Sequence, residues 1–208
     1  MAALICIMWP EIKKIRCYAQ AVVLSNPKSS VIQLASSFAA AKKQMREVYG
    51  VIDRSFYCHC KITFPVIDVV SCDLKDRIVF KDRYASLAYE HVVPAALLKK
   101  KLLKVSNTII GASNCLGFSR RCFRRGSELF KSIEGDLHNI RPVVARLNLL
   151  RGDKKITNLK KMNSRHKCNF KVSKLKFEPP DFVKGDVARI YLYMDKKYPE
   201  LSLSLIHI

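Results

Sequence analysis

The chain has 208 residues, of which 49% are hydrophobic, with only 7 Gly and 8 Pro; this composition favours one globular domain and argues against a disordered chain. Its 38 Lys and Arg against 17 Asp and Glu give a formal net charge of +21, which would repel itself unless a polyanion or salt screened it. Nucleic acid is therefore the first partner indicated, although membrane-surface proteins are also basic. No run reaches the roughly 18 apolar residues of a membrane span, so we expect no transmembrane segment.

Residues 1–36 are expected to form an N-terminal extension with a degenerate export signal. An apolar run at residues 2–9 comes before a basic cluster at residues 13–16, whereas basic residues precede the apolar run of a signal peptide. Initiation at Met8 would restore the usual order.

Eight cysteines in a chain of this size indicate either disulfides in an oxidising compartment or a bound metal. Cys58, His59 and Cys60 offer ligands one residue apart, instead of the gap of roughly two to four residues that zinc sites use. We therefore favour disulfides. A zinc-stabilised module that uses these residues and Cys72 is the alternative.

The first predicted element is an amphipathic helix over residues 37–49, where apolar residues recur at spacings of three and four. Two short runs rich in aromatic and branched residues follow, and they predict strands over residues 55–62 and 67–72. A third strand is predicted over residues 84–93, and it should end before Pro94, which cannot donate to a sheet ladder.

Residues 99–125 are basic and lack clear periodicity, which predicts a long loop, pinned by Cys115 and Cys122. Long loops of this kind are often functional.

Three helices are predicted after this loop. A short one covers residues 128–133, and a second begins at Pro142, a residue favoured at the first helical position, and runs to about Leu150. A third covers residues 183–198, where apolar residues again recur at helical spacing.

A polar pair, Glu90 and His91, stands at the end of the third strand. A lone histidine at such a place is more often structural than catalytic. Further polar residues follow in the segment 136–142 and at Asn148 and Arg151.

With these motifs the chain resembles the bacterial endonuclease I family, over residues 37–204. The segments that carry the resemblance are residues 56–60, 68–72, 90–95, 134–142, 147–148, 151–152, 178–180 and 189–194. Several motifs in one order are far more specific than any single motif. The resemblance implies an α+β fold with a ββα-metal (His-Me finger) core at residues 90–150, flanked by helices. It implies a periplasmic or secreted, monomeric endonuclease that cuts DNA, and RNA too, without sequence preference and leaves 5′-phosphate ends.

The resemblance also implies roles for individual residues. His91 matches the general base, and Glu90 and Asn148 match the ligands of Mg²⁺, which Mn²⁺ could replace. Asn139 matches the central Asn that holds the loop in shape. The other expected site residues are His138 beside Asn139, Arg120 or Arg121 as the catalytic arginine that stabilises the phosphate, and Lys99, Lys100, Lys101, Arg124, Arg125 and Arg151 as nucleic-acid contacts.

Chemistry agrees with these roles. Mg²⁺ prefers few protein oxygens and several waters, a bound metal ion stabilises charge on a phosphate and its leaving oxygen, and a neutral imidazole can take a proton from water. However, Glu90 and His91 are neighbours, and in a regular strand their side chains point to opposite faces. We therefore predict a bulge or a strand end at this pair.

Some positions depart from the family pattern. The family usually has an Arg and an acidic residue at Ser86 and Ala88, and an acidic residue at Arg146. Residues 205–208 end the chain where relatives continue, so the C-terminus is expected to be truncated. These departures support an alternative, a catalytically impaired relative that only binds nucleic acid.

Overall fold

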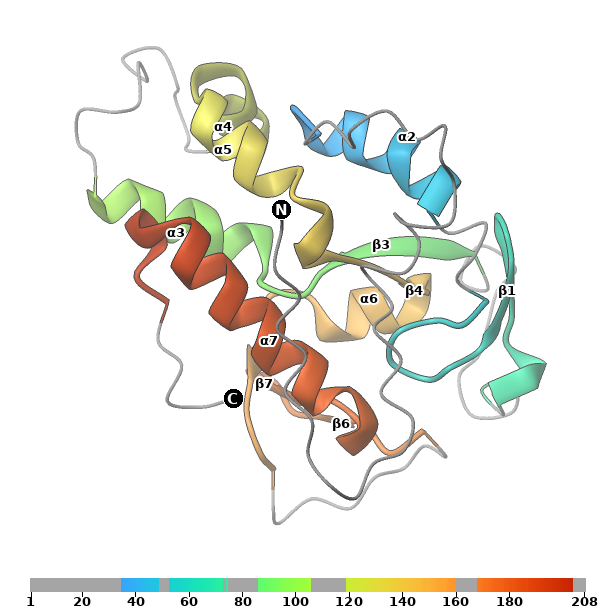
Figure 1. The fold of residues 1–208 in the computed structure, drawn as a ribbon. Helices are drawn as coiled ribbons and strands as arrows, with labels where there is room; N and C mark the ends of the chain where they lie inside the picture. The colour runs from blue at the N-terminus through green and yellow to red at the C-terminus, as the bar shows by residue number, and fades with distance from the viewer. Residues whose placement is uncertain are drawn as a thin grey trace, which may run out of the picture. The chain divides into compact units, whose positions relative to one another are not determined.

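Helices and short strands are mixed along the chain, which gives it an α+β architecture (Figure 1). The structure is a computed structural model and describes residues 35–48, 53–72, 74, 86–105, 119–159 and 168–203. The α-helices are α2 (Phe38–Val48), α3 (Ala95–Val105), α4 (Arg120–Gly126), α5 (Glu128–Glu134), α6 (Ala145–Arg151) and α7 (Asp181–Lys197). The strands are β1 (Lys61–Thr63), β2 (Val66–Asp68), β3 (Leu87–His91), β4 (Ile140–Val144), β5 (Lys155–Ile156), β6 (Lys171–Val172) and β7 (Lys176–Glu178). Short 3₁₀ helices are η1 (Val70–Cys72), η3 (Leu137–Asn139) and η4 (Pro199–Leu201).

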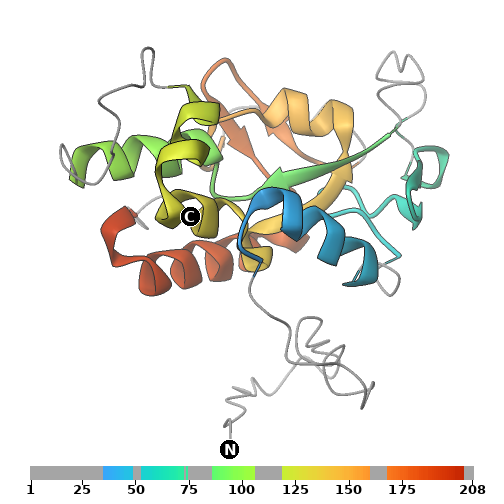
Figure 2. The same ribbon diagram turned by 90° about the horizontal axis from the view of Figure 1, so that it is seen from above.

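The antiparallel pair β3–β4 carries the predicted motif. Glu90 lies opposite Arg141 and His91 opposite Ile140, and α6 follows β4 without a loop. Helices α2 and α6 lie on opposite faces of this pair, as both views show (Figures 1 and 2). The strand predicted before Pro94 is thus present, and it ends at His91.

The prediction that Pro142 begins a helix is wrong, because Pro142 lies within β4, opposite Tyr89. The ring of proline fixes φ near −65°, which suits an edge strand as well as a helix start. Its carbonyl accepts a hydrogen bond from the Phe56 backbone N–H at 2.8 Å. The helix itself begins at Ala145.

The long loop predicted over residues 99–125 is also wrong at both ends. Helix α3 covers its start, and Leu98 and Leu102 are buried one turn apart. Helix α4 covers its end and begins at the cap Ser119, whose hydroxyl accepts from the Cys122 backbone N–H. Cys122 is disulfide-bonded, whereas the middle of the predicted loop, including Cys115, lies outside the described residues.

The strand predicted over residues 55–62 is largely wrong. Residues 56–58 form a turn, and only Lys61–Thr63 pairs with Val66–Asp68 as strands. His59 adopts a positive φ of 51°, a conformation that a regular strand cannot include. The strand predicted over residues 67–72 likewise stops at Asp68 and continues into η1.

The helices predicted over residues 37–49, 128–133 and 183–198 are confirmed as α2, α5 and α7. Along α7, Val187, Ile190 and Met194 are buried at spacings of three and four. Apolar burial at this spacing is what holds an amphipathic helix to a core.

The last strands form a small sheet in the order β5-β7-β6. Its buried Glu178 accepts hydrogen bonds from the Leu159 backbone N–H (2.6 Å), Lys184 (2.7 Å) and Lys171 (3.1 Å). Burial alone would raise the pKa of Glu178, but these three donors outweigh it and lower the pKa to about 2.

Two disulfides have both of their cysteines within the described residues: Cys58–Cys168, which joins segments 110 residues apart, and Cys60–Cys72. The preference for disulfides over zinc is therefore confirmed at these four positions. No helix among the described residues is long and apolar enough to cross a membrane.

Candidate functional site

The end of β3 sends two neighbouring side chains in different directions. The ladder stays in register to its last residue, His91, so the strand end predicted at this pair is present without a bulge. Glu90 contacts Tyr57 and Arg151, on the side of α6, whereas His91 contacts Phe38 on α2. Glu90 and His91 therefore point to opposite faces of β3, as neighbours in a regular strand do.

His91 is buried and held by a backbone carbonyl. Its Nε2 lies 2.8 Å from the Glu134 carbonyl oxygen, and its ring centroid lies 4.6 Å from that of Phe38. A carbonyl only accepts, so this contact assigns the ring proton to Nε2 and leaves a lone pair on Nδ1. Nδ1 takes no hydrogen bond from the part of the chain that the structure describes.

Burial lowers the pKa of His91 to about 4. This value is the net result of burial, which is the largest effect, of the hydrogen bond to Glu134, which raises the pKa, and of the nearby cations Arg120 and Arg124, which lower it. His91 is thus a neutral imidazole at pH 7, with one nitrogen ready to accept a proton.

Glu134 connects His91 to two arginines. Its carbonyl holds the imidazole, while its carboxylate accepts from Arg120 Nε (2.7 Å) and from Arg124 Nη2 (2.7 Å) and Nε. Burial raises the pKa of Glu134, but the bonds from both arginines reverse this effect and lower it. Glu134 belongs to one of the motifs that carry the resemblance, but the sequence did not indicate this role for it.

Of the two candidate arginines, Arg120 is the one that the structure places near His91, through Glu134. Arg121 is exposed, and none of the ion pairs among the described residues involves it. Arg124 was expected to contact nucleic acid, and the structure adds its pairing with Glu134 and a position 5.8 Å from the Phe38 ring. Arg125 is exposed on the same helix.

Glu90 is buried between the hydroxyl of Tyr57 and the guanidinium of Arg151. The Tyr57 hydroxyl donates to its Oε1 at 2.9 Å, and Arg151 Nε lies 3.2 Å from the same atom. Burial raises the pKa of Glu90, whereas Arg151 and Tyr57 lower it. Oε2 accepts no hydrogen bond from the described residues, so one carboxylate oxygen is left for another partner.

Asn148 stands on α6 three residues before Arg151, and these two positions share one stripe of the helix. Because Arg151 contacts Glu90, Asn148 lies on the stripe of α6 that faces Glu90, and it is half-buried. A carboxylate and an amide are hard oxygen ligands of the kind that Mg²⁺ prefers. With Oε2 of Glu90 unused, this donor set fits Mg²⁺.

The prediction that Arg151 contacts nucleic acid is wrong. Its side chain is only 1% exposed, and it donates to the carbonyls of His91 (3.2 Å), Val92 and Gly152 (3.0 Å). A guanidinium used in this way cannot reach a phosphate on the surface. Instead, Arg151 fixes the backbone that follows Glu90.

Asn139 holds the same segment from the other side. It is fully buried, its Oδ1 accepts from the Val93 N–H at 2.7 Å, and its Nδ2 donates to the Val93 carbonyl at 3.0 Å. The Asn139 carbonyl also accepts from the Val92 N–H. These contacts fit the expected holding role, which remains a prediction.

His138 lies beside another buried carboxylate, Asp136. Its Nδ1 is 3.0 Å from Asp136 Oδ1, and its ring stacks on Tyr193 of α7. The other Asp136 oxygen accepts from Tyr193, Tyr198 and Lys197. Burial would raise the pKa of Asp136, but these donors hold it far below its ordinary value. The cluster ties the loop before β4 to α7.

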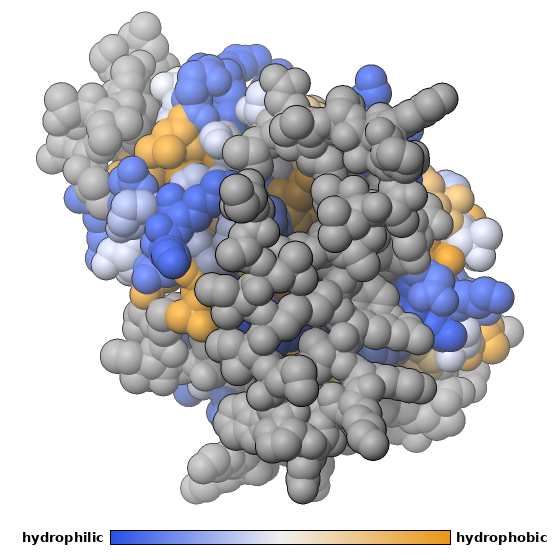
Figure 3. Space-filling view, viewed as in Figure 1, coloured by the Kyte–Doolittle hydropathy of each residue, from blue (hydrophilic) through white to orange (hydrophobic). Residues whose placement is uncertain are grey.

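Lys99, Lys100 and Lys101 lie on α3 and not in a loop. Lys100 is exposed, Lys99 lies 6.0 Å from the Phe123 ring, and Lys101 donates to the Ser202 carbonyl. Figure 3 shows hydrophilic side chains interspersed with hydrophobic ones over the region of α3, α4 and α5.

The alternative of a zinc-stabilised module is wrong, because Cys58, Cys60 and Cys72 are all in disulfides and cannot bind zinc as thiolates. Within the described ranges, no group of three His, Cys, Asp or Glu side chains could hold a metal ion together. Zinc sites usually need three or four such ligands.

The three departures from the family pattern lie at or just before the start of β3 and in α6. Ala88 is half-buried two residues before it, on the same face of β3. The Ser86 carbonyl accepts from the Ala145 N–H at the start of α6, and Arg146 follows on that helix.

Sequence comparisons agree with the resemblance. The family model described as Endonuclease I matches residues 38–206. Endonuclease-1 of Buchnera aphidicola subsp. Acyrthosiphon pisum (strain APS) is 29% identical, over 89% of this chain and 74% of the relative. A periplasmic deoxyribonuclease of Aeromonas hydrophila is 31% identical, over 85% and 72%, and an extracellular deoxyribonuclease of the same species is 27% identical, over 79% and 70%. The chain therefore belongs to the endonuclease I family.

Proposed function

We propose that this chain is a metal-dependent endonuclease that hydrolyses phosphodiester bonds of DNA and RNA without sequence preference. The observation that carries the proposal is the state of His91: a buried, neutral imidazole whose Nε2 is fixed by the Glu134 carbonyl and whose Nδ1 keeps its lone pair. The names of the related deoxyribonucleases support DNA as a substrate.

In this proposal His91 is the general base. Nδ1 takes a proton from the attacking water, and the Glu134 carbonyl stabilises the imidazolium through the N–H on Nε2. Such proton transfer is typically worth ~10²–10⁴ in rate. Arg120 is proposed to stabilise the phosphate, since its guanidinium lies beside Glu134 and the side chain is 45% exposed.

Glu90, through Oε2, and Asn148, through its amide oxygen, would hold Mg²⁺, or Mn²⁺ in its place. A bound divalent ion would neutralise charge on the scissile phosphate and on the leaving 3′-oxygen. Arg151 and Tyr57 keep the Glu90 carboxylate in place.

The opposite directions of Glu90 and His91 suit an in-line displacement. Such a reaction places the attacking and leaving oxygens on opposite sides of phosphorus. A phosphodiester bound across the end of β3 would have the base on the α2 side and the metal ligands on the α6 side. The products would be a 5′-phosphate and a 3′-hydroxyl. The two strands and the following helix would then form the ββα-metal core.

Phosphate-directed contacts position a duplex without reading its bases, which explains the proposed lack of sequence preference. The net charge of +21 and the exposed Lys100 and Arg125 would supply such contacts. We further propose a monomer exported to the periplasm or the medium, since the disulfides suit an oxidising compartment and two relatives carry these locations in their names.

The test compares the oxidised wild type, His91→Ala and a histidine control on plasmid DNA and on RNA, with Mg²⁺ and with EDTA. The control is His59→Asn, because Asn tolerates the positive φ at this exposed position. We expect wild type and control to degrade plasmid only with the metal, and His91→Ala to be slower by ~10² or more. Nicks that DNA ligase reseals would support 5′-phosphate ends. A folded wild type that shifts the plasmid but leaves it uncut would contradict the proposal and favour the binding-only alternative.

A further inference from the structure

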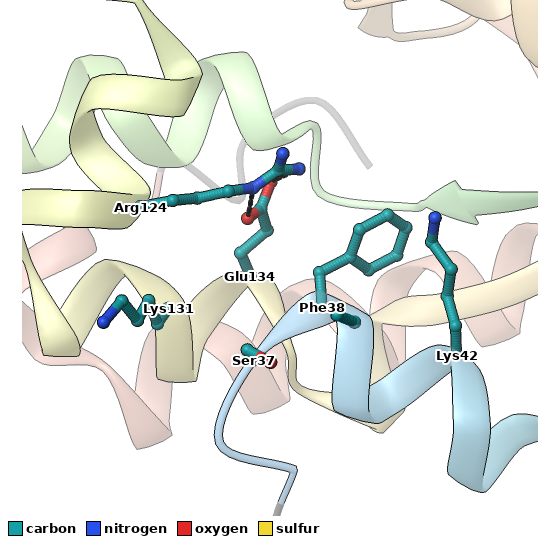
Figure 4. A pocket seen from close by; sticks show the side chains of 7 residues that line it. Ser37, Phe38, Lys42, Arg124, Lys131 and Glu134 are labelled. Carbon is teal, nitrogen blue, oxygen red and sulfur yellow. Dashed lines mark hydrogen bonds and ion pairs between the residues drawn. The ribbon is translucent and has the colours of Figure 1, made fainter.

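The first turn of α2, together with α4 and α5, encloses a pocket of about 210 Å³ (Figure 4). Its lining includes Phe38 and Lys42 from α2, Arg124 from α4, and Lys131 and Glu134 from α5. Figure 4 shows the Phe38 ring between the Arg124–Glu134 pair and Lys42. The pocket therefore combines three cations, one carboxylate and one aromatic ring.

The pocket suits an anion. Its carboxylate, Glu134, is already compensated by Arg120 and Arg124. Lys42 has no carboxylate partner among the described residues, and its ammonium instead lies 4.6 Å from the Phe38 ring centroid. Lys131 pairs with Glu128, whose side chain is 83% exposed, and exposed pairs of this kind are weak. Two cations are thus open to a new partner.

The pocket also adjoins the proposed base. Phe38 forms its wall and at the same time packs on the His91 ring at 4.6 Å. Glu134 lines the pocket and holds His91 through its carbonyl. Because Phe38 and Glu134 belong both to the pocket and to the surroundings of His91, a strand with one phosphate at His91 has a neighbouring phosphate, ~3.4 Å further along the duplex axis, close enough to occupy the pocket.

We propose that this pocket binds the phosphate that neighbours the scissile one, with Lys42 as the residue that contacts it and Lys131, at the opposite end of the pocket, adding positive charge (Figure 4). The inference rests on the proposed nuclease function and adds a second phosphate subsite to it. The walls are held together tightly: a Cβ on Gly135 would lie 2.7 Å from the backbone carbonyl carbon of Ser37. The start of α2 thus lies directly against the end of α5, and each of these two helices carries one of the lysines.

The test uses three oligonucleotides in which uncharged methylphosphonates replace most linkages. The first keeps a single ordinary phosphodiester, the second adds a charged phosphate on its 5′ side, and the third adds one on its 3′ side. The proteins are the wild type, the double variant Lys42→Gln/Lys131→Gln, and Lys196→Gln as a matched control, an exposed lysine on α7 away from the pocket lining.

We expect wild type and control to prefer one of the flanked oligonucleotides by about two- to five-fold in KM, and the double variant to lose this preference with kcat retained. The flanked oligonucleotide that is preferred shows whether the pocket binds the phosphate on the 5′ or on the 3′ side of the scissile one. Binding measured in EDTA should show a salt slope that is lower by ~0.7 in the double variant on single-stranded DNA. The proposal is overturned if the double variant keeps the full preference, or if the wild type shows none.

The two proposals fail separately. If the wild type cuts no nucleic acid, the nuclease function fails, while the binding comparison in EDTA still decides the pocket. If all three proteins cleave normally and show the same KM for the three oligonucleotides, only the proposal of a second phosphate subsite fails.

Discussion

Replacing Arg151 by Met should destabilise the protein strongly, although an arginine in a chain with +21 net charge would ordinarily be taken as a surface residue. The guanidinium is 1% exposed, donates to the carbonyls of His91 and Val92, and lies 3.2 Å from the Glu90 carboxylate. Met has a similar length and no donors, so Arg151→Met keeps much of the packing and removes the polar contacts.

Each carbonyl left buried without a donor costs about 1–3 kcal/mol, and breaking a buried ion pair from one side costs about 3–5 kcal/mol. These costs overlap, because the groups share one network and Glu90 can take up a proton. We therefore expect the free energy of unfolding at pH 7 to fall by roughly 4 kcal/mol.

Urea unfolding of the oxidised protein measures this loss, in a double-mutant cycle with Glu90→Gln. The double variant should lose less than the sum of the single variants, by ~1–2 kcal/mol. Arg189→Met, at an arginine that is 72% exposed, should change stability by less than ~0.5 kcal/mol. A loss below ~1 kcal/mol for Arg151→Met, together with weaker DNA binding, would refute this reasoning and restore a nucleic-acid contact.

Three further outcomes are expected. Glu178→Gln should lower the free energy of unfolding at pH 7 by about 1–3 kcal/mol. The folded pKa of about 2 lies below the ordinary 4.5, so the stability that the Glu178 carboxylate provides is present above pH 4.5 and lost as the pH falls toward 2. Urea unfolding curves of the variant and the wild type should therefore converge near pH 2. Arg120→Ala should lower kcat on the order of 10²-fold, whereas Arg121→Ala should change it little. Steady-state kinetics measure both values, and equal losses in the two variants would contradict the assignment. Asn139→Ala should lose about 2–4 kcal/mol in thermal or urea unfolding, since it strands two buried backbone groups.

Periodicity allowed α2 and α7 to be predicted, but it missed α3. Leu98 and Leu102 repeat at helical spacing there, yet the lysines between them dominated the interpretation as a basic loop. Pro142 misled for another reason: its fixed φ is compatible with both a helix start and an edge strand, and only the pairing with Tyr89 decides between them.

Most of the candidate site could be proposed from sequence motifs, including Glu90, His91 and Asn148. Burial could not be predicted, and burial separates Arg151, which serves the backbone, from exposed arginines such as Arg121. The position of Phe38 on His91 was also out of reach, because the helix pattern marks Phe38 only as apolar and says nothing about which strand it covers.

Distance along the chain gives the site an order of assembly. Arg151 is synthesised 60 residues after His91, which at ~5–20 residues per second takes roughly 3–12 s. β3 has no partner strand until β4 (Ile140–Val144) has been made, and Glu90 lacks the guanidinium that accompanies it in the folded protein until Arg151 follows. A nascent chain that has not yet reached Arg151 therefore carries only half of the proposed catalytic apparatus.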